Sequence, residues 1–202
     1  MKKFKINVKW VVSLLALGIT LNLFNRFLNF VESRPGVLLQ DPILALLPTQ
    51  DVTWPIFILI YGALAFTIVY LLKHPKQLLL GIQAYTLLTL FRFLAMYSLP
   101  LDPPVGMIIL RDPLVEAFGT SRILTKDLFF SGHTSLLTLL SFLMVERRLK
   151  VVFFSATACV AGLVLIQHVH YAIDVIAAPF FSYAAYRIST VLLNTNSQLR
   201  KM

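Results

Sequence analysis

The sequence predicts an all-α integral membrane protein with six transmembrane helices. Hydrophobic residues make up 58% of its 202 residues and charged residues only 13%, whereas soluble domains carry about 25% charged residues. A soluble protein of this length could not bury so much apolar surface. Apolar runs also recur along the chain at lengths near the roughly 20 residues that a spanning helix requires.

Six apolar stretches define the expected helices. They cover Val8–Phe30, Trp54–Leu72, Leu78–Leu99, Leu128–Val145, Val151–Gln167 and Tyr171–Leu193. The first stretch follows a basic start, but it is longer than the roughly 7–15-residue apolar core of a secretory signal and lacks a small-residue cleavage site. We therefore expect an uncleaved anchor helix. Because no repeat or second domain is evident, residues 1–202 are expected to form a single membrane domain.

The charges between these stretches predict the orientation. With the N-terminus inside, eleven Lys and Arg residues lie in inner segments and four in outer ones. The inner set is Lys2, Lys3, Lys5, Lys9, Lys73, Lys76, Arg147, Arg148, Lys150, Arg200 and Lys201, and the outer set is Arg34, Arg111, Arg122 and Lys126. This distribution follows the positive-inside rule and places both termini in the cytoplasm. It also accounts for the net charge of +9 without a nucleic-acid partner.

Two long outer segments, about 31–53 and 100–127, are rich in proline, whereas the inner connections are short. Long loops in a compact domain usually carry function, such as lids or binding loops. We therefore expect the active site at the outer face.

The segment Lys126–Thr134 combines a helix start with a histidine. Ser131 is a suitable N-cap, and a helix N-terminus binds anions through its unpaired N–H groups and its dipole. His133 in the first turn would place a proton donor beside a bound phosphate. The alternative is a Ser-Gly helix start with an interfacial histidine that has no chemical role.

A second pair of polar residues lies at the start of the last stretch. His170 and Asp174 are four residues apart, so they share one face of a helix. A carboxylate beside Nδ1 of an imidazole fixes its tautomer and makes Nε2 the better nucleophile. The alternative is a structural ion pair of Asp174, for example with Arg92. His168 does not share the face of His170 and is interpreted as a supporting or packing residue.

Arg92 lies in an otherwise apolar stretch, about two turns from its outer end. Arginine binds phosphate through a planar fork, and an ionisable residue at membrane depth is a functional hypothesis by default. Snorkelling of the side chain to the outer interface is the alternative.

A metal site is a further alternative for these residues. His133, His168, His170 and Asp174 could supply ligands, but a His-x-His pair suits a strand better than a helix. We therefore expect no metal. The single Cys159 lies in an apolar run and is expected to be a packing residue.

These residues resemble known motifs. Phe130–Thr134 followed by His170–Val175 is similar to the last two motifs of the sphingomyelin synthase family, a branch of the type 2 phosphatidic acid phosphatase superfamily. Asp127 matches an acidic residue of the first of these motifs, and Glu146 matches a glutamate further along the same helix. Thr89–Tyr97, with the following Leu-Pro, resembles an earlier motif that contains Arg92.

The resemblance spans residues 83–190, which we take as the catalytic core, and is weak over the first 80 residues. Lys126 stands where the family has glycine. The wider superfamily carries a Lys-x6-Arg-Pro motif, whereas here the one Arg-Pro pair, Arg34-Pro35, has Phe27 in the lysine position. The chain therefore resembles the synthase branch more closely. Its shortness suggests a microbial member of that branch.

The resemblance implies a lipid phosphotransferase that moves a phospho-head group from a glycerophospholipid to a lipid alcohol such as ceramide, without a cofactor. His170 would be the nucleophile, Asp174 its orienting residue and His133 the general acid and base. The expected substrate- and phosphate-binding residues are Arg92, Asp127, Ser131, Gly132, Thr134 and Tyr171.

Two other functions are kept open. In a lipid phosphate phosphatase, water would complete the reaction instead of a lipid alcohol. A non-catalytic lipid-binding membrane protein is the third reading. Self-association is compatible with the family, although no feature requires it. The basic N-terminus suits a bacterial inner membrane, with the site facing the periplasm.

Overall fold

Six α-helices form the regular structure of the described part of the chain, residues 8–112 and 123–198 of the computed structural model. They are α1 (Val8–Ser33), α2 (Thr53–Leu72), α3 (Pro75–Ser98), α5 (Gly132–Leu143), α6 (Arg147–Ile166) and α7 (Ala172–Gln198), with a 3₁₀ turn η1 at Leu44–Leu46. The all-α class is confirmed within these ranges. Outside them lie residues 113–122 of the predicted outer loop and the basic residues Lys2, Lys3, Lys5, Arg122, Arg200 and Lys201.

Five of these helices, α1, α2, α3, α6 and α7, are long and apolar enough to cross a membrane. Large apolar side chains point outward from the bundle: Leu15 is 60% exposed, Ile58 66% and Leu94 67%. Soluble proteins rarely expose contiguous apolar surface of this kind. The helices therefore indicate an integral membrane protein, with hydrocarbon as the solvent of its outer surface.

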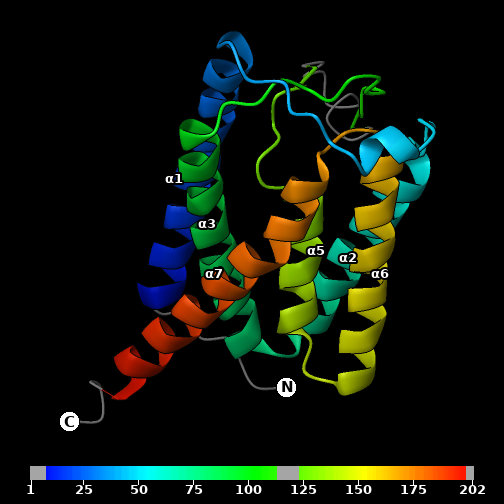
Figure 1. Ribbon diagram of the computed structural model, residues 1–202. Helices are drawn as coiled ribbons and strands as arrows, with labels where there is room; N and C mark the ends of the chain where they lie inside the picture. The colour runs from blue at the N-terminus through cyan, green and yellow to red at the C-terminus, as the bar shows by residue number, and fades with distance from the viewer. Residues whose placement is uncertain (1–7, 113–122, 199–202) are drawn as a thin grey trace.

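The predicted fourth helix, Leu128–Val145, was wrong in its length. Helix α5 has 12 residues and is therefore about 18 Å long, shorter than the roughly 30 Å hydrocarbon core. Residues 123–131 are not helical, and they turn down from the loops into the bundle (Figure 1). Hydropathy could not show this, because the non-helical part contains Leu128, Phe129 and Phe130 and is as apolar as a helix. The six expected spanning helices are thus five long helices and one short one.

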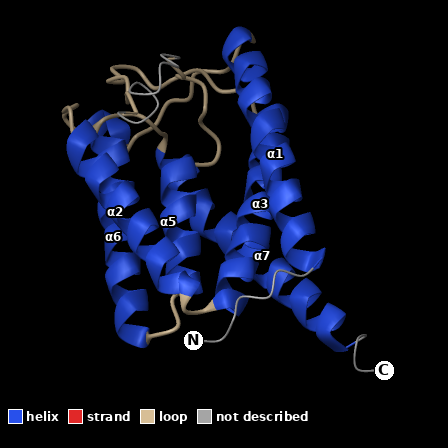
Figure 2. Ribbon diagram, turned by 180° about the vertical axis from the view of Figure 1, so that it is seen from behind, coloured by secondary structure: helices blue, strands red, loops and turns tan. Residues whose placement is uncertain are grey.

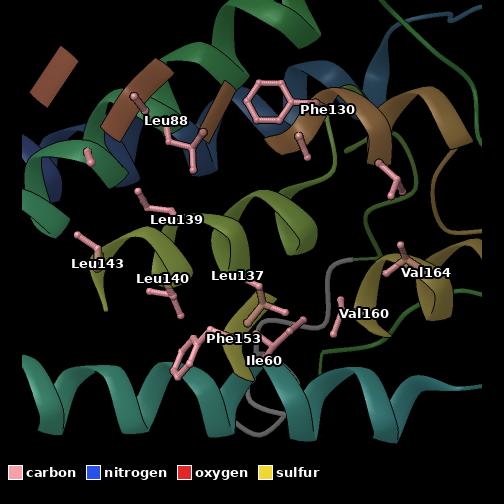
Figure 3. Packing of buried hydrophobic residues seen from close by; sticks show 14 of the residues in the cluster. Ile60, Leu88, Phe130, Leu137, Leu139, Leu140, Leu143, Phe153, Val160 and Val164 are labelled. Carbon is pink, nitrogen blue, oxygen red and sulfur yellow. The ribbon is translucent and has the colours of Figure 1, made fainter. Parts of the chain in front are cut away.

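Helix α5 packs against α2, α3, α6 and α7, whereas α1 packs against α3. Figure 3 shows Leu137 and Leu140 of α5 on the same side of that helix as Ile60 of α2 and Phe153 of α6, with which they form one apolar cluster. These four side chains are at most 5% exposed. The short helix thus forms part of the core, where its polar first turn is protected from lipid.

The long loops gather at one end of the bundle (Figure 2). Short turns join α2 to α3 and α5 to α6 at the opposite end, where α1 begins and α7 ends (Figure 1). This agrees with the predicted arrangement of the connections. The assignment of that second end to the cytoplasm stays a prediction.

A polar network holds the segment that leads down to α5. Glu32, at the end of α1, accepts hydrogen bonds from the backbone N–H groups of Thr125 at 3.0 Å and Lys126 at 3.1 Å. The Lys126 ammonium in turn donates to the Arg34 carbonyl at 2.8 Å and lies 2.8 Å from the Asp102 carboxylate. The network joins both long loops to the end of α1.

Replacing Glu32 by alanine should lower the free energy of unfolding by about 1–3 kcal/mol, because partly buried N–H donors lose their acceptor. Glu146→Ala is the matched control: this side chain is exposed and makes no cap at the start of α6, so its effect should stay within about 0.5 kcal/mol. Thermal unfolding in detergent, followed by circular dichroism, measures both. Equal losses would contradict this role of Glu32.

Candidate active site

A cavity of about 220 Å³ lies among α1, α2, α3 and α5, at the end of the bundle that holds the long loops. Its polar wall consists of Tyr61, Tyr85, Thr89, Arg92, Asp112, Asp127, His133 and Ser135. The rest of the wall is apolar, with Phe24, Phe57, Ile60, Leu64, Leu88 and Leu136 among its residues. The combination suits a ligand with an anionic group and a hydrocarbon part.

Two histidines from distant motifs meet beside this cavity. His133 is the second residue of α5, and His170 lies two residues before the start of α7. Their ring centroids are 5.9 Å apart, with an angle of 63° between the ring planes. His133 lines the cavity, whereas His170 is 1% exposed and is not part of the cavity wall. The structure thus brings the two predicted histidines into contact, with His170 the more deeply buried.

Asp174 joins the starts of α5 and α7. It is fully buried, and its Oδ2 accepts a hydrogen bond of 3.0 Å from the backbone N–H of Tyr171. This is half of a capping box, in which an acidic residue in the first turn reaches back to the residue that precedes the helix. The same oxygen lies 3.4 Å from Nδ1 of His170. The Asp174 carbonyl accepts a 3.1 Å hydrogen bond from the N–H of Ser131, which begins α5.

Arg92 forms an ion pair with Asp127. The sequence alternative, in which Arg92 pairs with Asp174, is therefore not the arrangement observed. The Arg92 guanidinium lies directly over Gly132, where an added Cβ would be 2.5 Å from Nη1. A larger residue at position 132 would therefore displace the guanidinium from this place.

Polar atoms without a partner concentrate around this cluster. Nε of Arg92, Nδ1 of His133 and Oδ1 of Asp174 are buried and have no hydrogen-bond partner among the described residues. A buried polar group that stays unpaired costs about 1–3 kcal/mol. Such groups usually point to a ligand or to water, and the free N–H of an arginine beside a helix N-terminus suits an anion.

The charge of Asp127 is maintained by its partner. Burial of the carboxyl opposes ionisation, but the Arg92 guanidinium outweighs this effect and holds the pKa of Asp127 below its ordinary value. Asp127 is therefore a carboxylate at neutral pH and compensates the charge of Arg92. A phosphate at Arg92 would lie close to this carboxylate, so the two anions would compete for one guanidinium.

Three of the predicted phosphate-binding residues do not line the cavity. Ser131 and Thr134 are buried, and their hydroxyls are 3.1 Å apart, with the Ser131 hydroxyl also accepting from the Thr134 N–H at 3.3 Å. Both therefore shape the start of α5. The Tyr171 hydroxyl points to the loops, donating to the Asp102 carbonyl at 2.8 Å and accepting from the Leu39 N–H at 3.2 Å.

His168 connects the loops, in agreement with a supporting role. One ring nitrogen lies 3.1 Å from the carbonyl of Val105 and the other 3.2 Å from the carbonyl of Leu47. Among the described residues, no group of three or more His, Cys, Asp or Glu side chains could hold a metal ion.

The structure adds residues that sequence reasoning missed. Asp41 accepts a 2.6 Å hydrogen bond from the N–H of Ala172 and so braces the start of α7. Phe57 and Tyr61 of α2 line the cavity, with the Phe57 ring centroid 6.3 Å from that of His133. Asp41 precedes proline in a long loop, which was a usable signal. Phe57 and Tyr61 lie in a continuous apolar run, in which no local sequence pattern marks them as functional.

Arg34, which belongs to the one Arg-Pro pair of the sequence, is not part of the cavity wall. It donates hydrogen bonds to the carbonyls of Met96 and Tyr97 in the last turn of α3. Basic side chains commonly satisfy the free carbonyls of a helix C-terminus. This structural role agrees with the missing lysine of the Lys-x6-Arg-Pro motif.

Residues 126–191 match the family model described as PAP2 superfamily C-terminal. The matched segment contains Asp127, Gly132, His133, His170 and Asp174 of the site. It supports a place for the chain in the type 2 phosphatidic acid phosphatase superfamily, whose members are phosphatases or phosphotransferases. No match to a curated protein was found.

Gly132→Ala should weaken the binding of an anion at this site, because the new methyl group displaces the Arg92 guanidinium. Loss of one charge-assisted hydrogen bond, about 1.5–3 kcal/mol, corresponds to roughly 10–150-fold weaker binding. The measurement is the thermal stabilisation of the detergent-solubilised protein by orthovanadate. Gly62→Ala is the matched control, since nothing lies within 4 Å of a Cβ at that position. Similar vanadate affinities for both variants would contradict the proposed contact.

Asp127 should give a pH dependence whose sign follows from its lowered pKa. Its ordinary value is 3.8, so the ion pair contributes stability above that pH and loses it as the pH falls through the folded-state pKa. Asp127→Asn should be less stable than wild type at neutral pH, and the difference should shrink below about pH 3.8. Denaturant titrations at several pH values measure this difference. A difference that does not change with pH would contradict the ion pair.

Proposed function

We propose that the protein is a lipid phosphotransferase, which moves a phospho-head group from a glycerophospholipid to a lipid alcohol such as ceramide through a phosphohistidine. The observation that carries the proposal is the meeting of His133, His170 and Asp174 beside a cavity that also presents Arg92. A buried pair of imidazoles, one of them next to a carboxylate, is the arrangement needed for nucleophilic catalysis with a separate proton carrier.

In the first half of the reaction, Nε2 of His170 attacks the phosphorus, and the bond from phosphorus to the diacylglycerol oxygen breaks. His133 donates a proton to that departing oxygen. Oδ2 of Asp174 lies 3.4 Å from Nδ1 of His170, without a hydrogen bond between them. A small approach of the two groups on substrate binding would form that bond, hold the ring in the tautomer whose Nε2 is free and stabilise the positive charge that develops on it.

In the second half, the hydroxyl of the acceptor attacks the phosphorus as the P–N bond breaks. His133, now neutral, takes the proton of that hydroxyl, so both histidines return to their starting states. Arg92 and the N–H groups of the first turn of α5 stabilise the charge on the equatorial oxygens in both steps. Asp127 balances the arginine between turnovers.

A membrane lipid is the substrate class that the surroundings favour. Apolar side chains from α1, α2, α3 and α5 line most of the cavity. A soluble phosphate ester would leave this surface in contact with water, whereas a lipid would cover it. Since no metal or other cofactor takes part in the proposed steps, protein side chains supply all the proton transfers.

A lipid phosphate phosphatase is the second candidate, because the match of residues 126–191 to the PAP2 superfamily C-terminal model is compatible with a phosphatase as well as with a phosphotransferase. The first half of the reaction would be the same, and water would then attack the phosphohistidine. Transfer requires that the site admit a second lipid and exclude water. We place transfer first because Arg34 caps α3 and the wider superfamily's Lys-x6-Arg-Pro motif is incomplete.

His170→Ala should lower lipid turnover by about 10⁴-fold or more, as expected when a nucleophile is removed. The assay uses proteoliposomes with fluorescent ceramide and phosphatidylcholine or phosphatidylethanolamine, and in parallel phosphatidic acid with detection of free phosphate. His74→Ala is the control with unchanged turnover, because His74 precedes α3 at the opposite end of the bundle.

A new phospho-sphingolipid in this assay supports transfer. Release of phosphate from phosphatidic acid without any transfer would contradict the transferase and support the phosphatase. Absence of turnover for every lipid, with His170→Ala indistinguishable from wild type, would contradict both enzymes and leave a lipid-binding protein.

A further inference from the structure

A second cavity, of about 300 Å³, lies in the other half of the bundle and is almost entirely apolar. It is bounded by α1, α2, α3 and α5. Aliphatic side chains dominate its wall, among them Leu78, Leu139, Leu140 and Leu143. Figure 3 shows the three from α5 side by side within the packed bundle. The catalytic steps proposed above use none of them.

The two cavities adjoin each other. Leu64 of α2, Tyr85 of α3 and Leu136 of α5 line both of them. Along α3, Arg92 belongs to the polar cavity and Gly81 to the apolar one, a distance along the helix of about 16 Å. A ligand held at Arg92 therefore lies next to an apolar cleft that extends toward the opposite end of the bundle, with the side chains of Leu64, Tyr85 and Leu136 at the boundary.

The chemistry of this cleft restricts its occupant. Water is held poorly in a space lined by aliphatic groups, and unfilled space forfeits the dispersion contacts of its lining. A polar head group would lose its hydrogen bonds there. A hydrocarbon chain attached to an anionic group fits the polar cavity and the apolar cleft at once, with the anionic group at Arg92 and the chain along α5.

We propose that the cleft holds one acyl chain of the lipid substrate and that the contact between Gly81 and Leu143 sets the longest chain accepted. This inference rests on the proposed function for the identity of the lipid as a substrate. A Cβ added at Gly81 would lie 2.8 Å from Cδ1 of Leu143, whose side chain is 2% exposed. Any larger residue at position 81 must therefore take space from the cleft, either with its own side chain or by displacing that of Leu143.

Gly81→Leu should shift the preference toward shorter chains. Turnover of dipalmitoyl lipid relative to dioctanoyl lipid should fall by about tenfold or more, because each methylene excluded from an apolar site changes affinity by roughly fourfold. Gly62→Leu is the matched control: it makes the same chemical change at a glycine with open space around it, so the ratio should stay unchanged. An unchanged ratio in Gly81→Leu would overturn the proposal.

A second variant tests the opposite direction and does not depend on tolerating a larger side chain. Leu78→Ala enlarges the end of the cleft farthest from Arg92 and should raise the turnover of distearoyl relative to dipalmitoyl lipid. Leu72→Ala serves as its control, since Leu72 is 58% exposed and does not line the cleft. Equal ratios for both alanine variants would contradict a chain held at this end.

Photo-cross-linking separates the chain site from the catalytic proposal. A phosphatidic acid that carries a diazirine near the end of one acyl chain should label peptides that contain Leu78 and Leu143. The labelling should decrease in Gly81→Leu and persist in Gly62→Leu. Labelling confined to the lipid-facing surface would overturn the chain site even if lipid turns over. Specific labelling of the cleft without any turnover would support the acyl-chain site and contradict the proposed enzymatic function.

Discussion

The hydrogen bond from the Ser131 N–H to the Asp174 carbonyl joins the start of α5 to the start of α7, and the geometry of the candidate site depends on it. His133 lies in the first turn of α5, and His170 lies two residues before the start of α7. A helix of 12 residues is too short to cross a bilayer, so its N-terminus must lie within the bundle. Backbone N–H groups at such a place need partners from the protein or from a ligand.

The short helix explains why the polar groups of the site are stable where they are. The non-helical segment before α5 brings Asp127 down to Arg92, and Gly132 leaves space for the guanidinium over the helix end. The positive end of the helix and the arginine then favour an anion at the same point. Since apolar residues surround this cluster, an anionic ligand here would be shielded from water and its electrostatic attraction would be strong.

Much of this arrangement could be predicted from the sequence, for identifiable reasons. The Ser-Gly-His start of α5 is a local pattern, and Ser131 is the N-cap of that helix as expected. The four-residue spacing of His170 and Asp174 indicated their proximity, but His170 lies before α7, so the two side chains meet through the turn into the helix and not on a shared helix face. The pairing of Arg92 with Asp127 is a long-range contact that no local pattern reveals. Hydropathy likewise could not distinguish the non-helical residues 128–130 from helix, nor show that the Tyr171 hydroxyl points to the loops. The aromatic wall of the cavity on α2 was hidden in a uniformly apolar run.

The central claim is that His170 becomes covalently phosphorylated during lipid turnover. The most direct measurement is to mix the protein with phosphatidic acid in liposomes, quench within the first turnover at alkaline pH, and map phosphohistidine by mass spectrometry of the peptides. We expect phosphate on His170. In a His133→Ala variant supplied with a lipid whose leaving group needs no protonation, the amount of phosphohistidine should increase, because the residue that takes the proton of the attacking hydroxyl is missing. Phosphate on His133 instead, or lipid turnover with no phosphohistidine at any time, would contradict it.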